Sequence, residues 1–275
     1  MKKTLWLRAL PLLFIAGVAV PASQPVSAQS QSQDIGRQME AEYGVLGDET
    51  SEGRRLNAMM DRTVERIVQG VNSQKRNSSF KLRSAKILGG RDAKHDQVVN
   101  AFALPDGRIC VTYGLLKLLR DSQYPEDELA FVVGHEVTHV AERHSAGQQK
   151  KALPYYLGAV LLGQVVKSGA ASQALGLGLQ AKTASFSRKD EYSADKGGLL
   201  AMEQAGYDPR AAATMLRRLK GPGEQNKFMN GVFGSHPISD NRIARVKEMV
   251  GDMESGRTLG SAADYEKGGR RDPDR

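Results

Sequence analysis

The sequence predicts a single α+β domain that is mostly helical and contains a small β-sheet. Three observations favour this fold class. Apolar residues recur at helical spacing in most of the chain, one short central stretch alternates like β-strands, and no internal repeat is present. The order helices, small sheet, helices is typical of α+β domains. The chain has 275 residues, of which 40 % are hydrophobic, so it can fill one core. We place this domain at residues 35–250.

The first 28 residues predict a cleavable signal peptide. They open with three basic residues, Lys2, Lys3 and Arg8. An apolar run from Ala9 to Val20 follows, and Val26-Ser27-Ala28 fits the small-x-small rule for cleavage, with cleavage after Ala22 as an alternative. The run has about 12 residues, whereas a membrane-spanning helix needs roughly 20, which disfavours an uncleaved anchor. We therefore expect an exported protein, most simply in the periplasm.

Segments of biased composition flank the predicted domain. Residues 29–34 are rich in Gln and Ser and predict a linker, and residues 251–275 are polar and charged and predict a disordered tail. The formal net charge is +8, and three of these charges lie in the signal peptide. No block of like charge remains, so we expect no nucleic-acid partner. Cys110 is the only cysteine, so it cannot close an internal disulfide, and we interpret it as a small buried residue.

Two helices and a small sheet are expected in the first half of the domain. The helices are predicted at Ile35–Tyr43 and Leu56–Val71, with a polar break after the second. Strands are predicted at Phe80–Leu88, Val98–Ala103 and Arg108–Tyr113. Because Pro105-Asp106-Gly107 is a favourable tight-turn sequence, the last two strands should form a hairpin.

The second half of the domain should be helical. Helices are predicted at Gly114–Arg120, from Pro125 to about His144, at Ser187–Gln204, at Pro209–Leu219 and from about Asp240 to Met249. The apolar stretch Ala152–Gln180 has its densest part at Tyr155–Val166, which is too short to span a bilayer. We interpret it as a buried or loosely packed helical hairpin; a mobile cover over the site and a membrane-facing surface are the alternatives.

One motif within a predicted helix carries the chemistry. His135-Glu136-Val137-Thr138-His139 has the H-E-x-x-H arrangement. A spacing of four residues places both imidazoles on one helix face, one turn apart, where they can bind the same ion. Glu136 then lies beside the metal without binding it and can act as a base toward water. The motif predicts one zinc ion per chain.

A catalytic zinc needs a third protein ligand and one open position. No third histidine follows at the spacing used by metzincins, so a carboxylate from another helix is expected, and Glu191 is the best candidate. Asp195 lies one turn further on the same face, where it can accept a hydrogen bond from a ligand histidine and fix its orientation. A purely structural zinc site is disfavoured, because its four ligands would normally be Cys or His.

The remaining histidines have weaker sequence signals. His236, in the loop sequence Ser235-His236-Pro237, is a candidate donor of a hydrogen bond to the oxyanion of the attacked carbonyl. His144 should point away from His135 and His139 by helical geometry, so we interpret it as structural. His95 belongs to no constellation.

Together these motifs resemble the Ste-type zinc endopeptidase family, metallopeptidase family forty-eight, and within it the exported BepA/LoiP-like and mitochondrial Oma-like branch. The resemblance also includes Asn100-Ala101-Phe102-Ala103-Leu104-Pro105, Gly114-Leu115-Leu116, Ala205-Gly206-Tyr207-Asp208-Pro209 and Arg242-Ile243, and it extends from about Ile35 to Val250. The chain lacks the transmembrane helices and the C-terminal helical repeats of some members, so substrate delivery through those parts does not carry over.

The resemblance implies a gluzincin fold whose active-site helix carries the H-E-x-x-H motif. It implies a zinc ion held by His135, His139 and Glu191, with Glu136 as catalytic base and His236 near the transition state. It also implies that an edge strand at Asn100, Ala101, Phe102 and Ala103 binds extended peptide. The expected partners are unfolded or extended exported polypeptides, with outer-membrane assembly machinery and peripheral membrane contact as further expectations.

A second function class stays open. The same fold can act as a chaperone or assembly factor with little turnover, if His236 itself occupies the fourth zinc position and keeps the peptidase latent.

Overall fold

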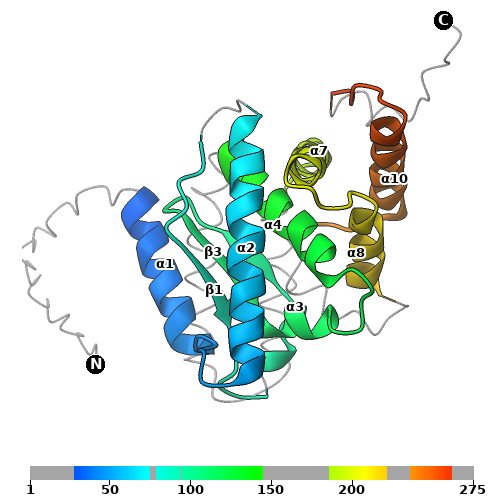
Figure 1. Ribbon diagram of the computed structural model, residues 1–275. Coiled ribbons are helices and arrows are strands. Elements are labelled where there is room, and N and C mark those ends of the chain that lie inside the picture. The colour runs from blue at the N-terminus through cyan, green and yellow to red at the C-terminus, as the bar shows by residue number, and fades with distance from the viewer. Residues whose placement is uncertain (1–27, 75–78, 94, 145–185, 222–235, 262–275) are drawn as a thin grey trace, which may run out of the picture.

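The computed structural model describes residues 28–74, 79–93, 95–144, 186–221 and 236–261. These residues form helices around a small mixed sheet, as the α+β prediction requires (Figure 1). The predicted signal peptide and the apolar stretch Ala152–Gln180 lie outside the described residues. No helix in the described part of the chain combines the length and apolar character needed to cross a membrane.

Two helices open the described structure. α1 is Ala28–Tyr43 and α2 is Ser51–Ser73, which begins at a cap where the Thr50 side chain accepts a hydrogen bond from the Gly53 N–H at 2.9 Å. The predicted apolar stripe of α2 is buried in the core: Leu56, Met60, Val64, Ile67 and Val71. Both helices pack against the same strand of the sheet and lie in front of it in Figure 1.

The linker predicted at residues 29–34 is wrong, because α1 already begins at Ala28. A tertiary contact explains the difference. The Arg108 guanidinium donates a hydrogen bond to the Gln33 carbonyl at 3.0 Å, and its side chain fills the space where Gly36 would carry a Cβ. The Gln- and Ser-rich segment is therefore held on the domain by a residue about 75 positions further along the chain.

The sheet has three strands in the order β1-β3-β2. β1 is Ser84–Leu88, β2 is Ala101–Ala103 and β3 is Arg108–Thr112; β1 runs parallel to β3, and β2 runs antiparallel to it. The predicted hairpin between the last two strands is confirmed. The Leu104 N–H donates to the Arg108 carbonyl at 2.8 Å, and Gly107 takes a φ of +91° that favours glycine. β2 is consequently an edge strand of the sheet that the described residues form.

The first strand begins at Ser84 and not at Phe80 as predicted, because the Asn72 side chain takes up the backbone hydrogen bonds of Phe80. The amide of Asn72 accepts from the Phe80 N–H at 2.8 Å and donates to the Phe80 carbonyl at 2.9 Å. Phe80 is thus buried without belonging to the sheet. Cys110 lies buried in β3, as predicted, and burial raises the pKa of its thiol to about 12, so the thiol is not a nucleophile at neutral pH.

α4, Pro125–Ala141, is the central helix of the molecule (Figure 1). It follows the short helices η1, His95–Gln97, and α3, Tyr113–Leu118. It packs against α2 and β2 and also against α7, Arg188–Gln204, and α8, Ala211–Lys220. A Cβ added to Gly134 of α4 would lie 2.9 Å from the Cα of Gly198 in α7, so glycine at both positions permits direct backbone contact.

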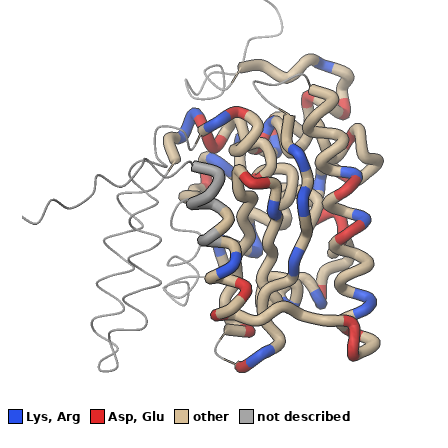
Figure 2. Tube along the Cα trace, turned by 90° about the vertical axis from the view of Figure 1, so that its left-hand side faces the viewer, with Lys and Arg blue, Asp and Glu red and all other residues tan. Residues whose placement is uncertain are grey.

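α10, Asp240–Glu254, packs against α7 and α8. The disordered tail predicted from residue 251 is wrong as far as residue 261. Leu259 is buried in the core, and the Lys196 ammonium donates to the carbonyls of Leu259 and Gly260 at 2.9 and 2.7 Å. The buried Leu259 side chain and the Lys196 ammonium hold this segment on the domain. The average composition of residues 251–275 is polar and charged, so it does not reveal these two contacts. Figure 2 shows Lys and Arg interspersed with Asp and Glu over the described trace.

Candidate metal centre

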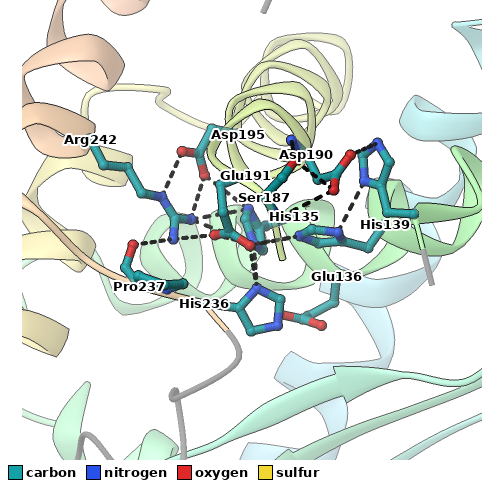
Figure 3. Close-up of polar contacts among 11 residues, drawn as sticks. His135, Glu136, His139, Ser187, Asp190, Glu191, Asp195, His236, Pro237 and Arg242 are labelled. Atoms are coloured by element: carbon teal, nitrogen blue, oxygen red, sulfur yellow. Dashed lines mark hydrogen bonds and ion pairs between the residues drawn. The ribbon is translucent and has the colours of Figure 1, made fainter. Parts of the chain in front are cut away.

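Four side chains with metal-ligating atoms meet in the interior. His135 and His139 come from α4, Glu191 from α7, and His236 from the segment before α10. All four are buried, and one ligand atom from each lies within 4.8 Å of the others. Figure 3 shows these side chains converging. The structure therefore brings together the three predicted ligands and places His236 in the same cluster.

Short distances link all four side chains of the cluster. His135 Nε2 lies 3.1 Å from His139 Nε2 and 3.1 Å from His236 Nδ1. Glu191 Oε1 lies 3.4 Å from His139 Nε2 and 2.9 Å from His236 Nδ1. Imidazole nitrogens and a carboxylate oxygen at such mutual distances form the donor set of a compact divalent cation.

Asp195 and Arg242 flank this cluster (Figure 3). Asp195 Oδ1 lies 2.9 Å from His135 Nδ1, the contact expected of a carboxylate that orients a ligand histidine. The Arg242 guanidinium donates to both oxygens of Asp195, at 2.8 and 2.7 Å, and also forms an ion pair with Glu191 Oε2. Arg242 thus connects α10 with the two acidic residues of α7.

The protonation of the ligands suits a metal site. Burial opposes ionisation of both acids on α7, but the Arg242 guanidinium and the neighbouring histidines together outweigh it. The pKa of Glu191 therefore lies well below its usual range, and the pKa of Asp195 is also lowered. Burial holds the pKa of His139 well below its usual value, which keeps the imidazole neutral. A deprotonated carboxylate and a neutral imidazole are the forms that bind metal.

The charges around the cluster also fit a divalent cation. The Arg242 guanidinium forms ion pairs with Glu191 and Asp195, and the buried Glu136 carboxyl group acts on it electrostatically. Three buried carboxyl groups and one guanidinium leave an excess of two negative charges, which a charge of +2 would balance.

Glu136 and His236 lie on the same side of the cluster. His236 Nε2 is 3.6 Å from Glu136 Oε1, and both residues line a small pocket with apolar side chains of α4 and α8, including Phe131 and Leu216. Burial lowers the pKa of His236, but the carboxylates of Glu136 and Glu191 outweigh it and raise the pKa overall. His236 therefore contacts both the expected base and the expected metal ligands.

His144 does not point away from the motif, and that prediction was wrong. Its Nδ1 lies 3.0 Å from Nδ1 of His139, on the side of the ring opposite the cluster. α4 ends at Ala141, and Arg143 has a φ of +58°, so His144 does not continue the helix. Ideal helical geometry would have placed it about 140° around the axis from His139.

Two further residues contact the cluster without having been predicted to do so from the sequence, Arg242 and Phe186. The Phe186 ring packs 4.0 Å from the His139 ring and 4.9 Å from the His236 ring, measured between centroids. The sequence did point to a residue such as Arg242, because the two acids predicted for the site, Glu191 and Asp195, need a cation nearby when they are buried. Phe186 precedes a helix start and gave no comparable signal.

The edge strand predicted to hold peptide packs against α4. Asn100 anchors its start: its N–H donates to Thr112 Oγ1 at 2.8 Å, and its side chain accepts from the Ala101 N–H at 2.9 Å. Phe102 packs on the opposite face of the sheet, with Met39 and Cys110. The side chains of Ala101 and Ala103 lie on the core side.

Comparisons with known proteins agree with this site. A family model described as Peptidase family M48 matches residues 57–250. Relatives include the mitochondrial metalloendopeptidase OMA1 of Arabidopsis thaliana, with 36 % identity over 54 % of this chain and 29 % of the relative. The beta-barrel assembly-enhancing protease of Yersinia pestis has 29 % identity over 62 % of this chain and 36 % of the relative. Metalloprotease LoiP of Escherichia coli has 31 % identity over 55 % of this chain and 59 % of the relative.

The matched region therefore covers less than two thirds of each of these relatives. The family match, by contrast, includes His135, His139, Glu191 and His236, all four residues of the buried cluster. The chain belongs to peptidase family M48, and the metal-ligand set of a metalloendopeptidase is complete within its own residues.

Proposed function

We propose that this chain is a zinc-dependent endopeptidase that hydrolyses peptide bonds in unfolded or extended polypeptides. The observation that carries the proposal is the buried set of His135, His139 and Glu191 with Glu136 beside it. Two histidines and one carboxylate from the protein are a donor set of catalytic zinc sites. His135, His139 and Glu191 would hold one zinc ion per chain.

Glu136 is the proposed catalytic base. When bound, zinc supplies a Lewis acid that polarises a peptide carbonyl and makes water more acidic. The Glu136 carboxylate takes a proton from the attacking water and later delivers it to the leaving amine. Glu136 is buried beside the ligands, and its Oε1 lies 3.6 Å from His236 Nε2.

His236 has two possible roles, and they predict opposite effects. As an oxyanion donor it would stabilise the transition state. Its Nδ1, however, lies within 3.1 Å of ligand atoms of both His135 and Glu191, so it can itself complete the coordination of the metal. That position favours a second candidate function, a latent peptidase that binds envelope proteins as a chaperone until His236 moves.

The substrate class follows from the edge strand. In an antiparallel pair, alternate residues turn their backbone groups away from the partner strand. Since Asn100 and Leu104 exchange hydrogen bonds with β3, Ala101 and Ala103 direct theirs toward the open edge. An extended peptide can pair there through backbone hydrogen bonds.

The cellular setting is proposed from the N-terminus and the relatives. A basic start, an apolar run and a small-x-small sequence support export to the periplasm through a cleavable signal peptide. One relative is named for enhancing β-barrel assembly, which supports quality control of outer-membrane proteins as the role. Outer-membrane assembly machinery and peripheral membrane contact belong to the same proposal.

The first test is cleavage of a permanently unfolded protein by the zinc-loaded mature chain and by a zinc-loaded Glu136→Gln variant. We expect turnover by the native chain and a loss of about 10²–10⁴-fold in the variant, the range for removal of a general base. Both proteins should bind equal amounts of zinc. Equal turnover by the two would exclude Glu136 as the base.

A His236→Ala variant separates the two functions in the same assay. If His236 is an oxyanion donor, turnover falls by about 10²–10³-fold. If His236 blocks the metal, turnover rises above that of the native chain. Tight binding of the unfolded protein without turnover by the native chain or by His236→Ala would favour the chaperone.

A further inference from the structure

His144 makes a contact that the proposed mechanism does not use. Its Nδ1 lies 3.0 Å from Nδ1 of His139, and the two rings meet edge to face with centroids 4.9 Å apart. The side chain of His144 is 11 % exposed, and its Nε2 faces Asp190 Oδ1 at 3.8 Å. Asp190, His144 and His139 thus form a row, in that order, that ends at the metal-ligand cluster.

The backbone is shaped to produce this row. Arg143 has a φ of +58°, and among the described residues no other non-glycine residue has a positive φ. The left-handed conformation disfavours residues with a Cβ, so neighbouring contacts must hold Arg143 in it. It ends α4 and turns the chain back, so that His144 lies against the last turn of the helix instead of continuing it.

Asp190 is also held in place. It forms a capping box at the start of α7, where its N–H donates to Ser187 Oγ at 3.1 Å and its carboxylate accepts from the Ser187 hydroxyl at 2.8 Å. Asp190 immediately precedes Glu191, so the same helix start positions a ligand and the outer member of the row.

The hydrogen-bond directions along the row are consistent. Nε2 of His139 belongs to the metal-ligand cluster, so the ring proton of a neutral His139 resides on Nδ1 and can be donated to Nδ1 of His144. His144 then carries its own proton on Nε2, which faces the carboxylate of Asp190. The inner donor of the row meets its acceptor at 3.0 Å, and the outer N–H faces a carboxylate at 3.8 Å. This direction leaves Nε2 of His139 free for the metal.

We infer that His144 is a positioning residue for the metal ligand His139: it accepts the Nδ1 proton of His139 and fixes the ring in the metal-binding tautomer. The structure thereby gives each motif histidine its own partner. His135 has the carboxylate of Asp195, and His139 has the imidazole of His144 backed by Asp190. This inference rests on the proposed zinc site, because it requires His139 to be a ligand.

The test compares the zinc affinities of His144→Asn and His144→Ala, measured by competition with a chromophoric chelator. The Asn side chain can place an oxygen acceptor near the original Nδ1, whereas Ala removes the acceptor. Loss of such a partner typically weakens metal binding about 10–100-fold, so we expect that loss for Ala and at most a few-fold change for Asn. The cobalt-substituted Ala variant should also show an altered visible absorption spectrum, whereas the Asn variant should match the native protein.

Three controls make the result decisive. His95→Ala removes a histidine that contacts Asp92 at 2.7 Å, outside the cluster, and should leave zinc affinity unchanged. Arg143→Val opposes the left-handed turn and should weaken zinc binding in the native background, but add little in His144→Ala. Arg143→Gly accommodates the turn and should bind zinc as the native chain does.

The failures of the two proposals differ. If the native chain and His139→Ala bind zinc equally, the proposed metal site is wrong. If His139→Ala loses zinc while His144→Ala and His144→Asn bind it as tightly as His95→Ala, only the role of His144 is wrong.

Discussion

Arg242 determines the electrostatic balance of the buried site. It is 4 % exposed and contacts the carboxylates of both Asp195 and Glu191. The surrounding anions raise the pKa of its guanidinium further against the effect of burial, so it stays charged. The free energy of unfolding should be sensitive to the loss of one member of this buried charge network. Water cannot reach the remaining charges to stabilise them in place of the lost partner.

Replacing Arg242 by Met should therefore destabilise the metal-free protein strongly. The change leaves two buried carboxylates without their cation, and breaking such a pair costs about 3–5 kcal/mol. Urea unfolding of the native and variant chains in the presence of a chelator measures the difference. Added zinc should recover part of the loss in the variant, because the ion supplies positive charge to the same carboxylates.

Arg210→Met is the matched control. Arg210 forms an ion pair with Asp208 at 2.7 Å, but its side chain is 70 % exposed, and water replaces the lost partner. No measurable change in the free energy of unfolding is expected. Equal destabilisation by the two Met variants would show that burial of Arg242 does not determine its contribution.

At the scale of elements, the contact between α4 and α7 sets the distance between ligands. Gly134 and Gly198 let the backbones of the two helices touch. Gly134 immediately precedes His135 in α4, and Gly198 lies seven residues after Glu191 in α7. Gly134→Ala would bring a methyl group to 2.9 Å from the Gly198 Cα, so the helices must separate. We expect a loss of about 1–3 kcal/mol in stability and weaker zinc binding.

Gly251→Ala is the control for that substitution. Gly251 lies within α10, and a Cβ there would meet nothing within 4 Å. Alanine should raise stability by about 0.5–1 kcal/mol through helix propensity, with zinc affinity unchanged. If Gly134→Ala behaved as Gly251→Ala does in thermal unfolding and zinc titration, close helix contact would not control the site.

The edge strand β2 offers a test of peptide binding that leaves the metal untouched. Ala103→Pro removes an N–H that faces the open edge, where proline is tolerated. One lost backbone hydrogen bond corresponds to about 0.5–1.5 kcal/mol, so kcat/KM for an unfolded protein should fall about 2–12-fold with zinc content unchanged. Phe102→Pro removes an N–H of the β2–β3 ladder instead and should lower thermal stability. Unaltered kcat/KM for Ala103→Pro would contradict peptide pairing at this edge.

At the scale of the whole molecule, the metal should connect parts of the chain that lie far apart in sequence. Its ligands span residues 135 to 236. An ion that binds only the folded state, at a free concentration of 1,000 times its Kd, adds about 4 kcal/mol to the free energy of unfolding. For a domain of this size that corresponds to a Tm increase of about 8–16 °C over the chelator-treated protein.

Two isosteric variants test that prediction by calorimetry. Glu191→Gln removes a ligand charge and should lose most of the zinc-dependent rise in Tm. Glu136→Gln removes the proposed base, which is not a ligand, and should keep it. A zinc-dependent rise of native size in Glu191→Gln would place the third ligand elsewhere.

The local features of this protein were predictable from its sequence alone. The stripe of α2, the Pro105-Asp106-Gly107 turn and the i, i+4 spacing of His135 and His139 each depend on residues within a few positions of one another. Glu191 and Asp195 were also predictable. Two motif histidines with no third histidine at the metzincin spacing favour a carboxylate as the third ligand, and helical spacing pairs these two acids.

Packing between distant segments determines which residues complete the site and how residues 29–34 and 255–261 are held on the domain. The helical segment at 29–34 depends on Arg108, the ordered segment after α10 depends on Lys196, and the role of Arg242 depends on α10 packing against α7. His144 escaped prediction because one left-handed residue, Arg143, ends the helix that its own sequence would continue. Contacts between distant segments determine these features, and local periodicity carries no information about them.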